Sequence, residues 1–187
     1  MTRPMPQNTR SEDIALRPVR ASEDAAALAA IYAEYVRGAW VSFEVEPPTP
    51  AEMQSRAEAI LARGLPYLVA ERVSSGAILG YVYASPYRAR AAYQSSVENS
   101  IYLHASAHRQ GVGTALMDAL VEACQALDLK TMVAIVGLDP SCDVSDNQSV
   151  RFHQNYGFKF VGVLENIGHQ FGRWTGTAML TLSLTDD

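Results

Sequence analysis

Apolar residues recur along the chain with two periods, and the order of these periods predicts a protein of mixed helices and strands. Short apolar or alternating runs, typical of strands, lie at 14–19, 67–72, 78–84, 97–103, 131–138, 158–164 and 177–184. Apolar residues at helical spacing follow Ser22 and Thr49 and recur at 116–127 and 150–156. The predicted order is a strand, two helices, a hairpin, a strand, a helix, a strand, a helix and two closing strands.

Residues with strong capping preferences mark the ends of the first two helices. Ser22 is expected to cap the first helix and Gly38 to end it. Thr49, Pro50 and Glu52 have the spacing of a capping box with proline at the first helical position. The segment between these helices, at 40–48, is predicted to be an extended loop.

Composition narrows the class of protein. The length of 187 residues and the hydrophobic content of 48% suit one domain, expected at 13–187 after a disordered tail at 1–12. The formal net charge of -5 argues against a nucleic-acid partner, because such proteins usually carry a basic patch. The first dozen residues lack the apolar core of a signal peptide, and no apolar run approaches membrane-spanning length, so no membrane partner is expected. The two cysteines are too few for a disulfide framework, which favours the cytoplasm.

A glycine-bearing turn, H-R-Q-G-V-G-T at 108–114, lies between a predicted strand and an amphipathic helix. Backbone N–H groups at a helix N-terminus form an anion site, Gly111 and Gly113 would let a phosphate approach the backbone, and Arg109 would add a charged contact. Alternatively, the two glycines only make a tight turn between strand and helix. The dinucleotide and nucleoside-triphosphate fingerprints are both excluded, because Leu116 occupies the third glycine position and no G-K-[ST] follows.

The turn belongs to a longer stretch, V-E-N-S-I-Y-L-H-A-S-A-H-R-Q-G-V-G-T-A-L-M-D-A-L at 97–120. This stretch resembles the acetyl-CoA motif of GNAT acetyltransferases, and specifically that of the phosphinothricin and methionine-sulfoximine acetyltransferase branch. Further motifs resemble that branch in the same order: S-F-E at 42–44, P-Y-R-A-R-A-A-Y at 86–93, S-V-R-F-H at 149–153, Y-G-F at 156–158 and F-G-R-W at 171–174. The resemblance covers about 14–184.

The resemblance implies an α/β (α+β) protein with the GNAT fold, in which a mixed, mostly antiparallel central sheet is flanked by helices and splayed strands form the acetyl-CoA cleft. It implies acetyl-CoA as co-substrate, no metal, and a homodimer. The residues implied to contact acetyl-CoA are Ile101, Tyr102 and Leu103 through the main chain, His108, Arg109, Gln110, Gly111, Val112, Gly113 and Thr114 in the turn, and Asn147 and Ser149. Asp146 stands where relatives have a CoA-contacting asparagine, so Asn147 is the substitute candidate.

Two residues are implied to be catalytic. Glu98 matches the glutamate that serves the branch as general base, directly or through water; the alternative is a solvent-facing charge on a strand. His153 matches a histidine of the branch and has a pKa suited to protonating the departing sulfur or relaying a proton from the amine. A structural hydrogen bond is the alternative for His153.

The acceptor is implied to be a small amino-acid-like amine, such as phosphinothricin, methionine sulfone or methionine sulfoximine. Residues implied to bind it are Phe43, Glu44, Tyr87, Arg88, Arg90, Tyr93 and Val97, with Trp40, Trp174 and Arg173 as further candidates. The branch motif K-F-G-R-W-x-D appears here as Q-F-G-R-W-T-G, so Gln170 and Gly176 depart from it. Two other functions stay open: an acetyltransferase for peptide amines or polyamines, and a CoA-binding sensor without turnover.

Overall fold

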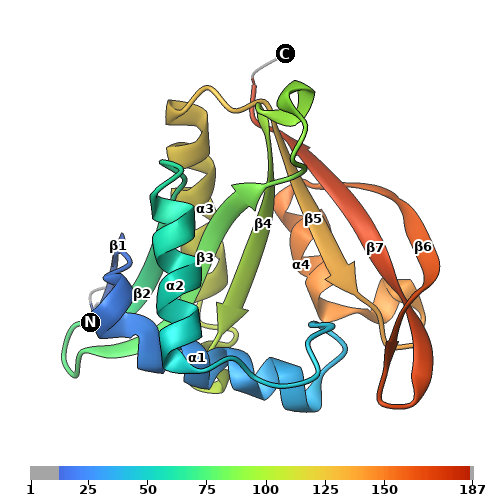
Figure 1. The fold of residues 1–187 in the computed structure, drawn as a ribbon, viewed down its shortest axis with the longest axis horizontal. Coiled ribbons are helices and arrows are strands. Elements are labelled where there is room, and N and C mark those ends of the chain that lie inside the picture. The colour runs from blue at the N-terminus through green and yellow to red at the C-terminus, as the bar shows by residue number, and fades with distance from the viewer. Residues whose placement is uncertain (1–12, 186–187) are drawn as a thin grey trace, which may run out of the picture.

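The computed structural model describes residues 13–185, in which one sheet of seven strands has the order β1-β2-β3-β4-β5-β7-β6 (Figure 1). The strands are β1 (Ile14–Pro18), β2 (Tyr67–Arg72), β3 (Ala77–Pro86), β4 (Ser96–Leu103), β5 (Thr131–Gly137), β6 (Lys159–Gln170) and β7 (Arg173–Ser183). The helices are α1 (Ala21–Gly38), α2 (Pro50–Leu61), α3 (Val112–Ala126) and α4 (Gln148–Tyr156), with short 3-10 turns η1 (Ala91–Tyr93), η2 (Ala105–Ala107) and η3 (Val144–Asp146). The predicted order of elements is confirmed. The tail expected at 1–12 lies outside the described residues.

The sheet is antiparallel except between β4 and β5, which run parallel. That parallel ladder joins only Ser96–Asn99 to Thr131–Ala134, after which the two strands diverge (Figure 1). The rest of β4 pairs only with β3, and the rest of β5 only with β7. The expected mixed, mostly antiparallel sheet with splayed central strands is therefore confirmed.

Helices cover both faces of the sheet (Figure 1). On one face, here called the front, α1 and α2 pack against a cluster rich in tyrosine, with Leu28, Tyr32, Tyr67 and Tyr81 among its members. On the back face, α3 and α4 pack against a mainly aliphatic core. The front core thus combines aliphatic side chains with several tyrosines, whereas the back core is mainly aliphatic, with Tyr156 packed against it.

Local signals placed the first two helices well, with one error. The Thr49 side chain accepts a hydrogen bond from the Glu52 N–H (3.2 Å), as expected for the N-cap of α2, and α1 ends at Gly38. Ser22 does not cap α1, because the helix begins at Ala21 and its N-cap residue is Arg20, whose side chain makes no capping hydrogen bond to the backbone of the first turn.

The last two strands are longer than their apolar pattern predicted. β6 and β7 continue to a tight turn at Phe171 and Gly172, whose positive φ values of 47° and 73° suit a two-residue hairpin turn. The outer part of this hairpin leaves apolar residues such as Ile167 (55%) and Trp174 (62%) exposed, so one-sided burial does not mark it in the sequence. The motif F-G-R-W is therefore the tip of a hairpin.

Across 13–185, none of the helices has the length and apolar character needed to cross a bilayer. In the same part of the chain, three or more histidine, cysteine or acidic residues nowhere gather as a metal site would require.

Candidate active site

Alternate residues of β4 point to opposite faces of the sheet, and this alternation divides the predicted site. Tyr102 packs with the front tyrosines, so Glu98, four residues earlier, also points to the front. Val97 and Leu103 pack in the back core, and Asn99 meets His153 of α4 on that same side. Glu98 and His153, the two predicted catalytic residues, therefore lie on opposite faces of one strand.

Glu98 is half-buried at the point where β4 and β5 begin to separate. Burial raises the pKa of its carboxyl, and the positive charge of Arg88 partly opposes that rise. Burial also raises the pKa of the Tyr83 hydroxyl, to which the charges of Glu98 and Glu44 both add. A carboxylate with a raised pKa in a partly dry site has the properties of a general base.

The loop after β3 brings an arginine and two aromatic rings close to Glu98. Tyr87 and Tyr93 meet edge to face with ring centroids 5.7 Å apart, and the Arg88 guanidinium lies over the Tyr87 ring at 5.1 Å. Arg90 is exposed before η1. Val97 differs from its predicted role: its side chain is 1% exposed in the back core, so only its main chain is available to a ligand.

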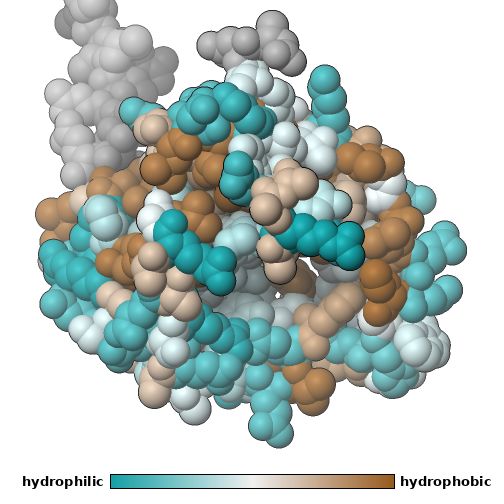
Figure 2. Space-filling view, turned by 45° about the horizontal axis from the view of Figure 1, so that its top comes forward, coloured by the Kyte–Doolittle hydropathy of each residue, from teal (hydrophilic) through white to brown (hydrophobic). Residues whose placement is uncertain are grey.

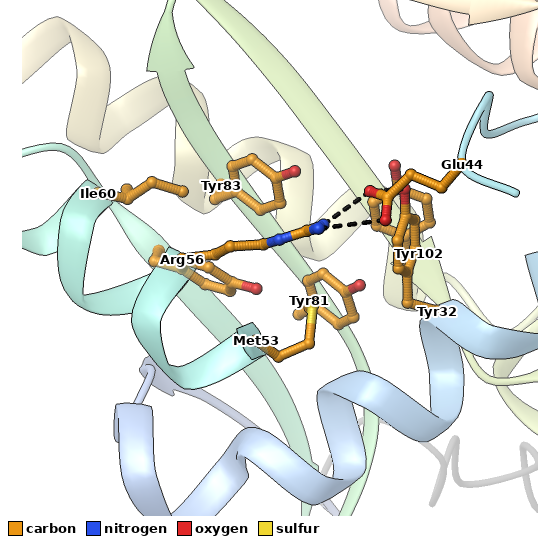
Figure 3. A pocket seen from close by; sticks show the side chains of 9 residues that line it. Tyr32, Glu44, Met53, Arg56, Ile60, Tyr81, Tyr83 and Tyr102 are labelled. Carbon is orange, nitrogen blue, oxygen red and sulfur yellow. Dashed lines mark hydrogen bonds and ion pairs between the residues drawn. The ribbon is translucent and has the colours of Figure 1, made fainter. Parts of the chain in front are cut away.

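Glu44 lies in a tyrosine-lined pocket, not at the surface of a loop (Figure 3). Arg56 of α2 donates to both of its carboxylate oxygens, at 2.7 and 3.1 Å, and the Tyr32 hydroxyl donates to one of them at 3.0 Å. The Arg56 hydrogen bonds hold the pKa of Glu44 below its usual value. The pocket, of about 60 Å³, is lined by Tyr32, Glu44, Met53, Arg56, Ile60, Tyr67, Tyr81, Tyr83 and Tyr102.

Beyond its ladder with β5, the edge of β4 that faces the splay carries the main-chain N–H groups of Ile101 and Leu103, and only one of them is available to a ligand. The Leu103 N–H donates to the Tyr35 hydroxyl (3.2 Å), which in turn donates to the Leu103 carbonyl oxygen (2.7 Å). By the alternation of strand N–H groups, Ile101 also faces the splay, whereas Tyr102 faces β3. The ladder with β5 ends at Asn99, so within the described chain the Ile101 N–H has no strand partner. Of the three predicted main-chain contacts, Ile101 is the one left available.

The turn before α3 has the form of an anion cradle. Arg109 and Gly111 both have positive φ, 58° and 81°, and no side chain caps α3 at Gly111. Main-chain N–H groups in such a turn, together with those of the first helical turn, point outward and lack helical partners. Arg109 and Thr114 are exposed beside them. These residues fit the pyrophosphate of a CoA molecule.

Other residues predicted for the turn have structural contacts of their own. A Cβ at Gly113 would lie 3.3 Å from Leu103 and 3.5 Å from Phe152, so this glycine serves the packing of α3. Val112 is buried, and Gln110 hydrogen-bonds the Ser106 carbonyl. His108 lies 3.5 Å from the Tyr35 hydroxyl.

Asn147 is the N-cap of α4. Its side-chain oxygen accepts from the N–H groups of Ser149 (2.9 Å) and Val150 (3.1 Å), and its amide donates to the Gly137 carbonyl (3.1 Å). These bonds tie the end of β5 to α4 and occupy the side chain predicted to contact CoA. These bonds leave one of the two amide hydrogens of Asn147 unused, so a CoA contact by this side chain would be additional to its structural role.

His153 is 3% exposed, and both of its ring nitrogens have partners. Nδ1 lies 2.7 Å from the Ser149 carbonyl, to which it can only donate, so Nε2 accepts from the Asn99 amide at 3.0 Å. Burial lowers the pKa of the ring, partly offset by the bond to Ser149. A neutral His153 in this arrangement has no proton directed at a ligand. Asn99 Oδ1 is buried and has no partner among the described residues.

Trp40, Trp174 and Arg173 lie at the β6–β7 hairpin. Trp40 packs edge to face on Phe171 (5.1 Å), and Arg173 donates to the Ser141 hydroxyl (2.6 Å). Glu98 is level with Thr181 of β7 through β5, and Trp174 is seven residues further along, roughly 23 Å of strand. Trp174 and Arg173, two of the further candidates for the acceptor site, therefore lie far from Glu98, because the closing strands extend further than predicted.

The sequence did not indicate that Arg56 and most of the front tyrosines line a pocket at the site. Tyr81 and Tyr83 alternate in a predicted strand, which placed them on one face, but nothing in a single sequence distinguishes a tyrosine-lined pocket from a tyrosine-rich core. Arg56 has the i+4 spacing from Glu52 of an ordinary surface helix pair. Only the loop at 40–48, by bringing in Glu44, turns this arginine toward the site.

Comparison with known proteins agrees with this geometry. The family model described as an acetyltransferase (GNAT) domain matches residues 17–179. The phosphinothricin N-acetyltransferase of Alcaligenes faecalis is 41% identical over 165 residues, which cover 88% of this chain and 80% of that protein. The L-methionine sulfoximine/L-methionine sulfone acetyltransferase of Pseudomonas paraeruginosa is 29% identical over 161 residues, covering 86% and 90%.

A solved structure agrees as well. The phosphinothricin acetyltransferase of Sinorhizobium meliloti, in complex with acetyl-CoA, superposes with a TM-score of 0.81 at 37% identity, over 91% of this chain and 88% of that one. The family match spans the splayed strands, the turn before α3 and the helices on both faces. The chain therefore belongs to the GNAT family and is an acetyl-CoA-dependent acetyltransferase.

Proposed function

We propose that the protein transfers the acetyl group of acetyl-CoA to the α-amine of a small amino-acid-like acceptor, with Glu98 as general base. The observation that carries this proposal is the position of Glu98: half-buried beside the splay, with a raised pKa and an arginine within electrostatic reach. Relatives that act on phosphinothricin and on methionine sulfoximine or sulfone support the class of acceptor.

Acetyl-CoA, when bound, supplies an acetyl group as a thioester. The turn at 109–114 would hold its pyrophosphate, and the Ile101 N–H would be the donor nearest the carbonyl oxygen. Glu98 would take a proton from the acceptor's ammonium group, directly or through one water, because an amine attacks only when it is neutral. His153 would support β4 and α4 without giving a proton.

The acceptor would be held by its carboxylate. The Arg88 guanidinium lies over the Tyr87 ring, has no salt-bridge partner among residues 13–185, and its charge reaches Glu98. One arginine near the base can hold an acceptor so that its amine faces Glu98. Arg90, Tyr93 and Glu44 would form the remaining walls, whereas Phe43 packs on Gly168 of the β6–β7 hairpin, level with Thr175, and would lie away from Glu98.

The reaction is tested by thiol release from acetyl-CoA over a panel of amino acids, methionine sulfone, methionine sulfoximine, phosphinothricin, polyamines and a peptide. The proposal expects the free amino-acid-like compounds to be the best acceptors. A peptide or polyamine as best acceptor would overturn the carboxylate contact and leave the acetyl-CoA chemistry.

The acetyl-CoA site has a matched pair of variants. Gly111→Val places a branched side chain at φ 81°, inside the proposed cradle, whereas Gly64→Val places one at φ 71°, in the turn after α2. Calorimetry should show acetyl-CoA binding lost in the first variant and retained in the second. Equal affinity in both would contradict the site.

We also propose a homodimer that acts in the cytoplasm. β6 is an edge strand, and its Phe160 (43%), Val161 (58%) and Leu164 (45%) side chains are exposed. Hydrophobic patches line the right-hand side of Figure 2, on which β6 lies in Figure 1. Light scattering of wild type and of Val161→Glu tests the dimer.

The proposed cytoplasmic location is supported by the two cysteines, which are both present as thiols, as expected in a reducing compartment.

A further inference from the structure

The hydroxyl of Tyr35, near the end of α1, is hydrogen-bonded to the main chain of Leu103 as a neighbouring strand would be. The Leu103 N–H donates to this hydroxyl at 3.2 Å, and the hydroxyl donates to the Leu103 carbonyl oxygen at 2.7 Å. Both groups of Leu103 face the splay, beyond the point where the ladder between β4 and β5 ends. A side chain from a helix thus closes the edge of β4 at the last residue of the strand.

The position of this hydroxyl is set by the packing of its ring. The Tyr35 ring meets the Tyr102 ring edge to face, with centroids 5.3 Å apart, and packs against the front cluster. Burial raises the pKa of the hydroxyl, which therefore keeps its proton for the Leu103 carbonyl oxygen. His108 Nε2 lies 3.5 Å from the hydroxyl, at the outer limit of a hydrogen bond, and is a second partner within reach.

Leu103 lies between the two parts of the proposed acetyl-CoA site. The turn at 109–114 follows the end of β4, and a Cβ at Gly113 would lie 3.3 Å from the Leu103 side chain. Ile101, whose N–H would meet the thioester carbonyl, lies two residues before Leu103 on the same edge, about 7 Å along the strand. The pantetheine arm joins the pyrophosphate to the thioester, so its course from the turn to Ile101 passes the edge of β4 at Leu103.

The chemistry of the arm matches that edge. Pantetheine contains secondary amides, and each has one N–H and one carbonyl group, as a strand residue has. Such an amide can pair with the main chain of Leu103 in the manner of an added strand. The single hydrogen of the Leu103 N–H is already shared with the Tyr35 hydroxyl, so the amide can take it only in place of that hydroxyl.

We propose that Tyr35 is a further residue of the acetyl-CoA site: its hydroxyl occupies the position of the ligand's amide at Leu103 in the free protein, and acetyl-CoA displaces it on binding. The hydroxyl satisfies an open strand edge while the cleft is empty. It also lowers the affinity for acetyl-CoA, because its bonds to Leu103 must be broken when the ligand binds. This inference rests on the acetyl-CoA part of the proposed function and is independent of the acceptor.

Calorimetry of acetyl-CoA binding to Tyr35→Phe tests the displacement. The variant keeps the ring that packs on Tyr102 and removes only the hydroxyl, so the dissociation constant should fall roughly 3- to 10-fold, the range for one net hydrogen bond. Tyr156→Phe removes a hydroxyl that donates to Asp118 at 2.8 Å on the other side of the sheet, and this matched control should leave the affinity unchanged. An equal or higher dissociation constant in Tyr35→Phe would overturn the proposal.

A ligand without the arm shows where the effect originates. Adenosine 3′-phosphate 5′-diphosphate carries the pyrophosphate of CoA and lacks pantetheine, so wild type and Tyr35→Phe should bind it equally. A gain in affinity of the same size for this compound and for acetyl-CoA would place the effect in the turn and not along the arm, which would also overturn the proposal.

Hydrogen exchange followed by NMR gives a readout that does not depend on turnover. In ligand-free wild type, the Leu103 N–H should exchange more slowly than the Ile101 N–H, which has no strand partner within the described chain. In ligand-free Tyr35→Phe the two should exchange at similar rates, and acetyl-CoA should then protect both. Protection of Ile101 alone in the ligand-bound variant would show that the arm does not pair with Leu103.

The acceptor assay separates failure of this inference from failure of the proposed function. Tighter acetyl-CoA binding by Tyr35→Phe, in a protein that acetylates none of the amino-acid-like compounds, would leave the role of Tyr35 standing and overturn the proposed reaction. Acetylation of those compounds, with unchanged acetyl-CoA affinity in Tyr35→Phe, would overturn the role of Tyr35 and leave the reaction standing.

Discussion

The two faces of β4 differ in what their polar groups are able to do. On the front, Glu98 has a raised pKa and no hydrogen-bond partner among the described residues, and beyond it lies a pocket whose walls carry hydroxyl and carboxylate groups. On the back, the polar pair Asn99 and His153 is enclosed in an aliphatic core. One strand thus separates a surface suited to proton transfer from one that supports the fold. Proximity in sequence alone would have grouped Glu98 and Asn99.

The largest expected effect comes from the front carboxylate. Glu98→Gln keeps the size of the side chain and removes the base, so turnover should fall by about 10²-fold or more. Steady-state kinetics measures it, with Glu122→Gln on the exposed side of α3 as control. Near-normal turnover of Glu98→Gln across pH would place the base elsewhere.

The raised pKa of Glu98 also predicts how Glu98→Gln changes the free energy of unfolding at different pH values. Because burial raises the folded-state pKa of Glu98, its contribution to stability declines as pH rises from the ordinary glutamate value, about 4.3, through the raised value. Glu98→Gln should therefore gain stability relative to wild type over that window and keep the gain above it. Urea unfolding at several pH values measures the difference; a constant difference from acid to neutral pH would argue against a raised pKa.

Arg88→Ala should have the next largest effect. Loss of a charge-assisted contact to a carboxylate should lower kcat/KM for a free amino acid roughly tenfold to a hundredfold. Because Arg88 lowers the pKa of Glu98, its removal should also move the acidic limb of the kcat/KM profile to higher pH. Arg151→Ala, on α4, serves as control. An unchanged acidic limb would contradict an influence of Arg88 on the pKa of the general base.

Gly137→Ala tests how closely the loop at 40–48 packs against the end of β5. The added Cβ would lie 1.9 Å from the Trp40 carbonyl oxygen, so the loop at 40–48 must move. We expect a destabilisation of about 1 to 3 kcal/mol, as for other overpacked sites, together with lower activity. Gly162→Ala, where no atom lies within 4 Å of the new Cβ, should be close to neutral. Equal unfolding midpoints for the two variants would contradict the close approach.

The smallest effect on turnover is expected on the back face. His153→Phe should change turnover less than roughly tenfold and leave both limbs of the pH profile in place, because a general acid or base would contribute more. Stability should fall by about 1 to 3 kcal/mol, since the Asn99 amide loses its partner. Loss of a limb in this variant would give His153 a catalytic role and remove the distinction between the two faces.

The sequence by itself determined the order of elements and the reaction class. Period-two and helical spacing placed each strand and helix, Thr49 marked the start of α2, and the motif at 97–120 indicated the GNAT family. These features depend on short-range preferences and on residues that follow one another in the chain. They can be predicted without the tertiary structure, because each is formed by residues within a segment of about 25 residues.

Only the tertiary structure decided which polar groups have partners. Asn147 and His153, both candidates from the motifs, are engaged in hydrogen bonds with groups on other elements, and Val97 turns into the core. Arg56 gave no signal, because a helix arginine is ordinarily solvated, and Gln170 was marked only as a departure from the branch motif and not as a buried amide. Their surroundings are formed where the loop at 40–48 meets α2 on one side and the β6–β7 hairpin on the other. Long-range packing sets desolvation and hydrogen bonding there, and these decide which side chains are available to a ligand.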